Sequence, residues 1–465
     1  MIGISVRDIA ERINGSVHRL NLDQIITEYP VIDSREAKPG SFFVAIPGVN
    51  VDGADFIEMA LENGATFALT MRRGENPSII VSDPLAALAQ LAEFARERAQ
   101  HCTFIGITGS QGKTTTKELL GHILMSAGET VIPAGSFNNE IGLPLTILRC
   151  TDTTKFCVLE MGARHEGDIA KLCKIAKPQV GAVLVVGSAH LGEFGDRAAI
   201  GRAKGELIEN IAPGGVAILG SYDEFTPLMG EGRSDITRMS FGESSGCTVR
   251  AADIEIREGR AHFDLVTPAG RAAVSLRILG AHQIANALAA SAIATSLGIS
   301  LETIAATLST ADISSKWRME LHDLGDFVII NDSYNANPES TKAALKTLAL
   351  FAQERGGASW AFLGKMHELG ESETQSHQEI GRLAISLGLD HLVGVGTDLY
   401  NVESESLTLH SATDIDAAMR IAENIEPGDC VLIKASRAEK LNLLAERIIT
   451  ACSSRSTSMH EGEQK

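Results

Sequence analysis

The chain has 465 residues and a formal net charge of −18 at pH 7, and 44% of its residues are hydrophobic. A chain of this length is expected to form roughly three domains. The excess of negative charge argues against a nucleic acid or a membrane surface as a general partner, so local basic residues must meet any anionic substrate. No apolar run reaches the ~20 residues that a membrane span requires.

Cysteine usage and the first residues indicate the compartment. The seven cysteines are scattered and lack metal-like spacing, which favours reduced thiols. Arg7, Asp8, Glu11 and Arg12 stand where a signal peptide would need an apolar core. We therefore expect a cytoplasmic protein without a membrane span.

Residues 1–82 are expected to form a small mixed α/β domain. Ser5 can cap a short helix near the start of this domain. The polar cluster Asp33-Ser34-Arg35 directly follows two apolar residues. Taken alone, this cluster is typical of a solvated turn, with a ligand site as the alternative. Residues 83–102 are expected to form a linker helix, because proline stands at its first turn.

The motif Gly106–Thr116 is the strongest functional signal in the chain. It follows the apolar Phe104-Ile105 and precedes Lys117–Leu124, which has apolar residues at helical spacing. This order predicts a strand, a glycine-rich loop and a helix start, which together form a phosphate cradle. Lys113 is expected to reach the terminal phosphates, and the Thr114 hydroxyl is expected to bind Mg²⁺.

The spacing of this motif departs from the usual P-loop pattern. The strict pattern requires glycine at position 107, where this chain has Ile107. The alternative is a glycine-rich turn with a chance Gly-Lys-Thr, but the flanking strand and helix favour a nucleoside triphosphate site. The loop residues expected to bind ATP are Gly109, Ser110, Gln111, Gly112, Lys113, Thr114 and Thr115.

Residues 103–315 are expected to form a central ATP-binding domain. Its alternating strands and helices predict a parallel sheet, whose ligands gather beyond the carboxyl ends of the strands. Glu160 and His190 each follow a buried strand and are candidates for the metal and phosphate site. Their alternatives are a helix cap and a surface histidine. Residues 212–275 look like antiparallel additions to this domain.

Two further residues of the central domain leave alternatives open on pattern alone. Lys204 has the pattern of an ordinary exposed lysine on a helix. Asn286 lies in an alanine-rich helix, where its carboxamide can face an adenine edge or belong to a plain core helix.

The third expected domain covers residues 316–452 and is a doubly wound, Rossmann-like α/β unit. Its strand Phe327–Ile330 runs into the polar loop Asn331–Pro338, and so many polar side chains after a strand indicate a ligand. A closing helix is expected to end near Thr450. The polar residues 453–465 are expected to form a flexible tail.

Together these motifs resemble those of the Mur ligases, ATP-dependent amide-bond ligases of peptidoglycan synthesis, over nearly the whole chain. Thr108–Thr115 is similar to the P-loop of that superfamily, which accounts for the displaced glycine. Phe137–Pro144 is similar to its asparagine-rich substrate loop. Further residues fall in the family's order, namely Glu160, His190, the run Ala203–Glu206, His282, Asn286, Arg318 and Asp332.

The resemblance implies roles for these residues. Lys204 looks like a lysine that is carbamylated in relatives and can then hold a second Mg²⁺. Glu160 and His190 become expected metal ligands beside Thr114. The implied catalytic residues are Lys113, Lys204, His190 and Glu160, and the implied ATP contacts outside the P-loop are His282, Asn286, Arg318 and Asp332.

Within the family, the loop Asn331–Pro338 is similar to that of members that add D-alanyl-D-alanine to UDP-N-acetylmuramoyl-tripeptide. Members that add a diamino acid have a different loop here and an Asp-Asn-Pro-Arg motif that this chain lacks. That sister activity, a folate polyglutamate ligase and a P-loop regulatory ATPase are the alternatives. Lys365 stands where the family pattern has aspartate, so no role is carried over to it.

The implied substrates are ATP, UDP-N-acetylmuramoyl-tripeptide and D-alanyl-D-alanine, with Mg²⁺ as cofactor and a monomer as the assembly. The uridine nucleotide is expected on the N-terminal domain, ATP on the central domain and the dipeptide near the third, which swings in to complete the site. The expected substrate contacts are Ser34, Arg35, Asn138, Asn139, Tyr334, Asn335, Asn337, Ser436 and Arg437.

Overall fold

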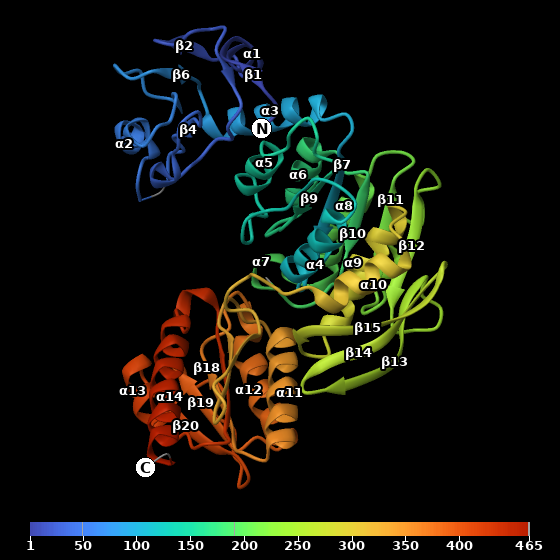
Figure 1. The fold of residues 1–465 in the computed structure, drawn as a ribbon, viewed down its shortest axis with the longest axis vertical. Coiled ribbons are helices and arrows are strands. Elements are labelled where there is room, and N and C mark those ends of the chain that lie inside the picture. The colour runs from blue at the N-terminus through green and yellow to red at the C-terminus, as the bar shows by residue number, and fades with distance from the viewer. Residues whose placement is uncertain (49, 190, 464–465) are drawn as a thin grey trace.

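The computed structural model describes residues 1–48, 50–189 and 191–463. The chain forms three consecutive α/β units that follow one another along the long axis of the molecule (Figure 1). Within the described ranges, no helix combines the length and the apolar character that a membrane span needs. The mixed α/β class and the parallel-rich sheets agree with the fold predicted from the sequence.

The N-terminal unit is built on a small four-stranded sheet with the order β2-β6-β5-β4. Ser5 caps its first helix, because the serine hydroxyl accepts the Asp8 N–H at 3.0 Å. A 3-10 helix, Ser34–Glu36, carries the polar cluster. The elements are β1 (Ile4–Ser5), α1 (Val6–Arg12), β2 (Ser16–His18), β3 (Ile25–Ile26), β4 (Phe43–Val44), α2 (Ile57–Glu62), β5 (Ala68–Thr70) and β6 (Ser78–Ile80).

Helix α3 (Pro84–Arg98) joins the first two units. Its start is fixed by Asp83, whose carboxylate accepts the N–H groups of Leu85 and Ala86, and by Pro84 in the first turn. Its apolar face contacts α1 of the first unit and α5 (Gly142–Ile147) and α6 (Asp168–Ala176) of the second. One continuous core therefore runs from the N-terminal unit into the central unit.

The central unit contains a nine-stranded sheet with the order β15-β14-β13-β12-β11-β10-β7-β9-β8. Alternate side chains of β7 pack on opposite faces: Ile105 and Ile107 lie in the core that includes α4 and α9, and Phe104 lies in the core beneath α3, α5 and α6. The remaining elements are β7 (Thr103–Thr108), α4 (Lys113–Met125), β8 (Thr130–Val131), β9 (Phe156–Glu160), β10 (Val180–Val183), α7 (Leu191–Phe194), α8 (Arg197–Glu209), α9 (Gln283–Ser296) and α10 (Leu301–Thr310).

The prediction that residues 212–275 are antiparallel additions is wrong for the first half of that segment. Strands β11 (Val216–Gly220) and β12 (Thr237–Gly242) pair parallel to their neighbours, and a long crossing segment rather than a hairpin turn joins the two. Only β13 (Val249–Arg257), β14 (Arg260–Thr267) and β15 (Gly270–Leu279) form an antiparallel meander.

The C-terminal unit is a six-stranded sheet with the order β16-β17-β21-β18-β19-β20, parallel except for β16. Helices cover both faces: α11 and α12 lie over the core that contains Val328 and Ile330, and α13 and α14 lie over the core that contains Phe327 and Ile329. The elements are β16 (Glu320–Asp323), β17 (Val328–Asp332), α11 (Pro338–Arg355), β18 (Ser359–Leu363), α12 (Glu373–Ser386), β19 (His391–Val395), β20 (Thr408–Ala412), α13 (Ile415–Ala422), β21 (Cys430–Lys434) and α14 (Asn442–Glu463).

The end of the chain differs from the sequence-based prediction. Helix α14 does not stop near Thr450, and residues 453–463 continue it where a flexible tail was expected. Cys452 is buried, and the Ser456 hydroxyl donates to Leu324 O at 3.2 Å and to the Asp326 carboxylate at 2.8 Å. These contacts with the β16–β17 turn hold the helix beyond the point where its sequence turns polar.

Candidate active site

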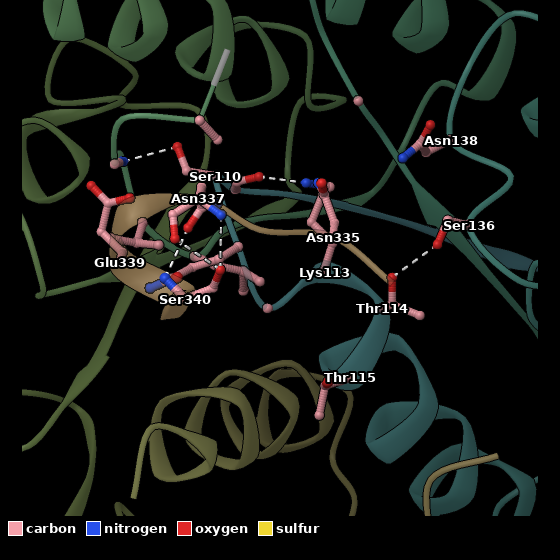
Figure 2. Close-up of a pocket in the computed structure, with 18 of the residues that line it drawn as sticks. Ser110, Lys113, Thr114, Thr115, Ser136, Asn138, Asn335, Asn337, Glu339 and Ser340 are labelled. Atoms are coloured by element: carbon pink, nitrogen blue, oxygen red, sulfur yellow. Dashed lines mark hydrogen bonds between the residues drawn. The ribbon is translucent and has the colours of Figure 1, made fainter. Parts of the chain in front are cut away.

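A cavity of about 1280 Å³ lies between the central and C-terminal units. The carboxyl ends of β7, β9 and β10 open into it from one side, and those of β17 and β21 open into it from the other. Figure 2 shows P-loop side chains of the central unit near Asn335, Asn337, Glu339 and Ser340 of the C-terminal unit. Two sheets therefore place their ligand-binding edges against one space.

The glycine-rich loop has the geometry of an anion cradle. Gly112 adopts a left-handed backbone with φ 82°, and a Cβ at this position would clash with Asn286 Oδ1. Helix α4 begins directly after Gly112, and no side chain caps its N-terminus. The first N–H groups of this helix are thus left for a bound anion, which fits a phosphate.

Two lysines line the cavity beside this loop. Lys113 donates from Nζ to Gly109 O at 2.7 Å, and burial lowers the pKa of its ammonium. Lys204 on α8 is 4% exposed, and burial together with nearby Lys113 lowers its pKa to about 7. In the part of the chain that the structure describes, its amine has no hydrogen bond or ion pair. The pattern-only expectation of an exposed lysine is therefore wrong.

A buried carboxylate completes the phosphate side of the cavity. Glu160 is 1% exposed at the end of β9; its Oε2 accepts from the Thr114 hydroxyl at 3.1 Å and its Oε1 from Asn138 Nδ2 at 3.0 Å. The described residues contain no group of three or more His, Cys, Asp or Glu side chains that could hold a metal ion. Hard oxygen donors in small number fit Mg²⁺, which keeps waters and substrate phosphates as its other ligands. His190, the expected third protein ligand, lies outside the described residues.

His282 and Asn286 lie at the start of α9, and both line the cavity. Burial lowers the pKa of His282 to about 4, so the imidazole is neutral at pH 7. Asn286 donates from Nδ2 to Gln283 Oε1 at 2.7 Å, and its Oδ1 accepts from the Thr116 hydroxyl at 3.4 Å. Polar groups thus meet close to Gly112 in an otherwise apolar, alanine-rich helix.

The segment that enters the C-terminal unit supplies a cation. Arg318 donates from Nη2 to the Ser136 hydroxyl of the central unit at 3.1 Å. Its guanidinium lies 4.0 Å from the ring centroid of Tyr334. The aromatic face orients the guanidinium without neutralising its charge, which leaves a cation at the junction of the two units.

Asp332 ends β17 with its carboxylate engaged by the protein. Its Oδ2 accepts from Lys434 Nζ at 2.6 Å, and its Oδ1 accepts from Met319 N at 3.1 Å. Lys434 also donates to Asn335 O at 2.9 Å, so it holds the middle of the polar loop. These contacts form the floor on the C-terminal side of the cavity.

The loop residues of the C-terminal unit that were expected to bind substrate line the cavity. Several of their side chains, however, form hydrogen bonds within the C-terminal unit. Asn337 caps α11, because its Oδ1 accepts from Ser340 N at 2.8 Å in a reciprocal capping box. The Ser436 hydroxyl accepts from His367 N at 2.9 Å. Arg437 donates to Asn442 Oδ1 at 3.0 Å and lies over the ring of Trp317.

Three domain models of one family match the chain. They are the Mur ligase family catalytic domain over residues 31–99, the Mur ligase middle domain over residues 107–294 and the Mur ligase glutamate ligase domain over residues 317–437. The UDP-N-acetylmuramoyl-tripeptide–D-alanyl-D-alanine ligase of Mycobacterium tuberculosis (strain H37Rv) is 37% identical, over 97% of this chain and 98% of that protein. The chain belongs to the Mur ligase family.

Solved structures of Mur ligases agree with this assignment. MurF from Acinetobacter baumannii superposes with a TM-score of 0.86 at 34% identity, over 96% of this chain and 99% of that chain. MurF ligase from Thermotoga maritima in complex with ADP gives a TM-score of 0.79 at 31% identity, over 92% of this chain and 99% of that chain. Mur ligases are ATP-dependent, in agreement with the phosphate cradle described above.

Two residues expected to contact substrate lie away from the cavity that holds the Mur ligase P-loop. Ser34 is buried in the N-terminal unit, and its hydroxyl donates to Met59 Sδ at 3.3 Å. The Arg35 side chain is 81% exposed and pairs with Asp33, an interaction that lowers the pKa of the Asp33 carboxyl to about 2. The structure does not bring these residues to the P-loop.

The position that departs from the Mur ligase pattern also lies outside the cavity lining. The ammonium of Lys365 lies 3.0 Å from the Glu373 carboxylate at the start of α12. The backbone carbonyl of Lys365 accepts from Ser436 N at 3.2 Å, which ties the loop after β18 to the loop after β21.

Sequence reasoning missed several residues of this Mur ligase cavity. Ser136 lies within 3.3 Å of the Thr114 hydroxyl, and Glu339 lines the cavity from the first turn of α11. Lys434 is the clearest omission, because a lysine at the end of an otherwise apolar strand is a recognisable signal.

Asn139 was expected to bind substrate; it lines the cavity, and its Oδ1 accepts from Gly142 N at 3.0 Å.

Proposed function

We propose that this chain uses ATP to join the amino group of D-alanyl-D-alanine to the terminal carboxylate of UDP-N-acetylmuramoyl-tripeptide, with release of ADP and phosphate. The observation that carries this proposal is the single cavity that combines an uncapped P-loop helix with the polar loop after β17. Full-length similarity to ligases named for this reaction supports it. The loop Asn331–Pro338 favours it over the diamino-acid-adding activity.

The reaction needs an activated carboxylate, because a carboxylate in water has no leaving group that an amine can displace. A carboxylate oxygen attacks the γ-phosphorus of ATP, the bond to ADP breaks, and an acyl phosphate forms. The dipeptide amine then attacks the acyl carbon and loses a proton. Phosphate leaves with one of the original carboxylate oxygens, and an amide remains.

The first step brings two anions together, so the site must offset negative charge. Lys113 and the N-terminus of α4 lie where the phosphates are expected, and Arg318 adds a cation from the other side. Thr114 and Glu160 would hold Mg²⁺, which on binding supplies further charge neutralisation.

Lys204 is proposed to carry a carbamate. A buried amine with a pKa of about 7 is about half neutral at pH 7 and mostly neutral at pH 8, and a neutral amine adds to CO₂ with loss of one proton. The product is a carboxylate, an oxygen donor of the class that Mg²⁺ prefers. No acidic side chain lies in the described surroundings to pair with a charged Lys204, which supports the neutral form.

The acyl phosphate must also be kept from water. The C-terminal unit covers the P-loop, and we propose that its residues Arg318, Asp332, Asn335 and Ser436 reach the site when this unit docks. The uridine nucleotide is proposed to bind the N-terminal unit near the exposed guanidinium of Arg35. This arrangement gives each substrate its own unit.

Phosphate release with ATP, Mg²⁺ and UDP-N-acetylmuramoyl-tripeptide, with and without D-alanyl-D-alanine, tests the proposal. We expect release that depends on the dipeptide and a product heavier by the dehydrated dipeptide, with no release by Lys113→Ala. Turnover only with UDP-N-acetylmuramoyl-dipeptide and a diamino acid would assign the sister reaction. Release that ignores every muramyl substrate would leave a P-loop ATPase.

A further inference from the structure

Three segments that are far apart in the sequence meet at Gly187. The Gly187 N–H donates to the hydroxyl oxygen of Ser110 in the P-loop at 2.8 Å. The next residue, Ser188, contacts the C-terminal unit: its N–H and its hydroxyl donate to the two carboxylate oxygens of Glu339 at 3.0 and 2.9 Å. Figure 2 shows Ser110 of the P-loop and Glu339 of the C-terminal unit in the same part of the cavity.

The contact is specific in its geometry. Each oxygen of Glu339 takes a different donor of the same residue, and charge-assisted hydrogen bonds of this kind are stronger than neutral ones. Glu339 lies in the first turn of α11, where the helix N-terminus stabilises a carboxylate. Neither Ser188 nor Glu339 is needed to hold the core of its own unit.

The segment 185–188 is closely packed between the P-loop and the start of α11. A Cβ at Gly187 would lie 3.3 Å from Glu339 Cδ and 3.3 Å from Ser110 Cβ, so the three parts are in contact without spare room. The Ser110 N–H also donates to Val185 O at 2.9 Å, which fixes the P-loop residue to the same segment twice. Gly187 and Ser188 therefore connect α11 to the P-loop through direct contacts.

We propose that Glu339 is a positioning residue that ties the shape of the P-loop to docking of the C-terminal unit. When the C-terminal unit is docked, Glu339 fixes the position of Ser188. Gly187, the preceding residue, then holds Ser110 in the conformation used for phosphoryl transfer. The proposal rests on the ligase function proposed above and deepens it. Glu339 acts through Ser188 and Gly187 and is assigned no contact with substrate.

A second contact limits how far the two units separate when the first is removed. Gly192 N donates to Glu368 O at 3.0 Å, and the Arg164 guanidinium lies 3.9 Å from the Glu368 carboxylate. Loss of the Glu339 contact is therefore expected to misalign the P-loop rather than to separate the units fully. The turnover number should fall more than the affinity for ATP.

Steady-state kinetics of Glu339→Gln and Ser188→Ala test the proposal. Each variant should lower kcat about tenfold, as expected when an aligning contact is lost, with the KM for ATP within about twofold of wild type. The double variant should be no slower than the slower single variant, because both substitutions weaken the same contact. Glu354→Gln removes the same charge from an exposed position of α11 and should behave as wild type.

A double-variant measurement of kcat distinguishes a positioning role of Glu339 from a merely structural one. Ser110 and Glu339 are linked through Gly187 and Ser188 rather than by a direct hydrogen bond, yet the effects of Ser110→Ala and Glu339→Gln on kcat should be less than multiplicative. Strictly multiplicative effects, or a Glu339→Gln variant with wild-type kcat, would overturn the proposal. If Glu339→Gln fails to fold, shown by its thermal unfolding, Ser188→Ala and Ser188→Thr test the contact from the other side, and only the threonine variant should keep activity.

Small-angle scattering tests the docking role of Glu339 without any measurement of ligase activity. With a non-hydrolysable ATP analogue, Glu339→Gln should have a larger radius of gyration than wild type and Glu354→Gln. That result supports the docking role even if the wild type shows no ligase activity with muramyl peptides. Identical radii for all three proteins would contradict it.

Discussion

The ammonium group of Lys434 lies 2.6 Å from Asp332 Oδ2, and the two residues are register partners at the carboxyl ends of β21 and β17. Their side chains are 2% and 13% exposed. An ion pair withdrawn from water in this way contributes little net stability as a pair, but removal of one partner leaves an uncompensated charge. The pair therefore fixes the geometry of the cavity floor.

Lys434→Met is expected to lower the free energy of unfolding of the protein by about 3 kcal/mol, because the Asp332 carboxylate then lacks its cation in a mostly buried place. Chemical denaturation followed by circular dichroism measures this change. The control is Lys342→Met on α11, whose side chain is 43% exposed with its ammonium 3.6 Å from the Glu379 carboxylate. That exposed pair should contribute less than about 1 kcal/mol. Equal effects of the two substitutions would contradict the assignment.

Lys204→Ala should lose about a hundredfold or more in kcat, because the site then lacks a carboxylate that offsets charge during phosphoryl transfer. Added bicarbonate or a short carboxylate such as acetate or propionate should restore part of the activity. Lys174→Ala, at an exposed position of α6, should remain fully active. Wild-type kinetics in Lys204→Ala would remove the proposed carbamate, as would the absence of rescue by any small carboxylate.

His377 should make the stability of the C-terminal unit depend on pH. It is fully buried; its Nε2 accepts from Met366 N at 2.9 Å, and its Nδ1 lies 2.7 Å from Glu373 O, an arrangement that needs a neutral ring. Burial lowers its pKa, with Lys365 and His367 as nearby groups that act in the same direction and the Glu373 carboxylate opposing them.

The sign of this effect follows from proton uptake. Below the ordinary pKa of about 6.5, the unfolded state binds a proton that the folded state resists, so stability falls as the pH decreases. Denaturation midpoints measured from pH 8 to pH 5 should decline below pH 6.5. His377→Gln should make that decline smaller, and His101→Gln, at an exposed position, should leave it unchanged. A pH-independent midpoint in the wild type would contradict the argument.

Local sequence signals predicted the helix starts and the phosphate cradle. Ser5 and Asp83 cap helices because their side chains need only the next few backbone N–H groups, and Gly112 forms the loop with its own backbone. The mixed α/β fold and the Mur ligase family are likewise confirmed. The helix caps and the glycine-rich loop depend only on residues that are close in the sequence.

Features that depend on distant neighbours were not visible in the sequence. The pairing of Lys434 with Asp332 requires the sheet order, which places β21 beside β17. Ser456 contacts the β16–β17 turn, so α14 continues where the sequence alone suggested a tail. The parallel direction of β12 follows from a long crossing segment that carries no hairpin signal.

Gly112→Ala is expected to weaken nucleotide binding strongly. A Cβ would clash with Asn286 Oδ1, and the residue would have to keep a left-handed backbone with φ 82°, which costs an alanine roughly 1 kcal/mol. The loop should relax by moving away from α9, which changes the cradle at the N-terminus of α4. Calorimetric titration with an ATP analogue should show an affinity at least about tenfold lower, equivalent to about 1.4 kcal/mol. Gly232→Ala provides the control, because a Cβ at that exposed loop position meets no atom within 4 Å. Equal affinities for the two variants would mean that Gly112 does not shape the site.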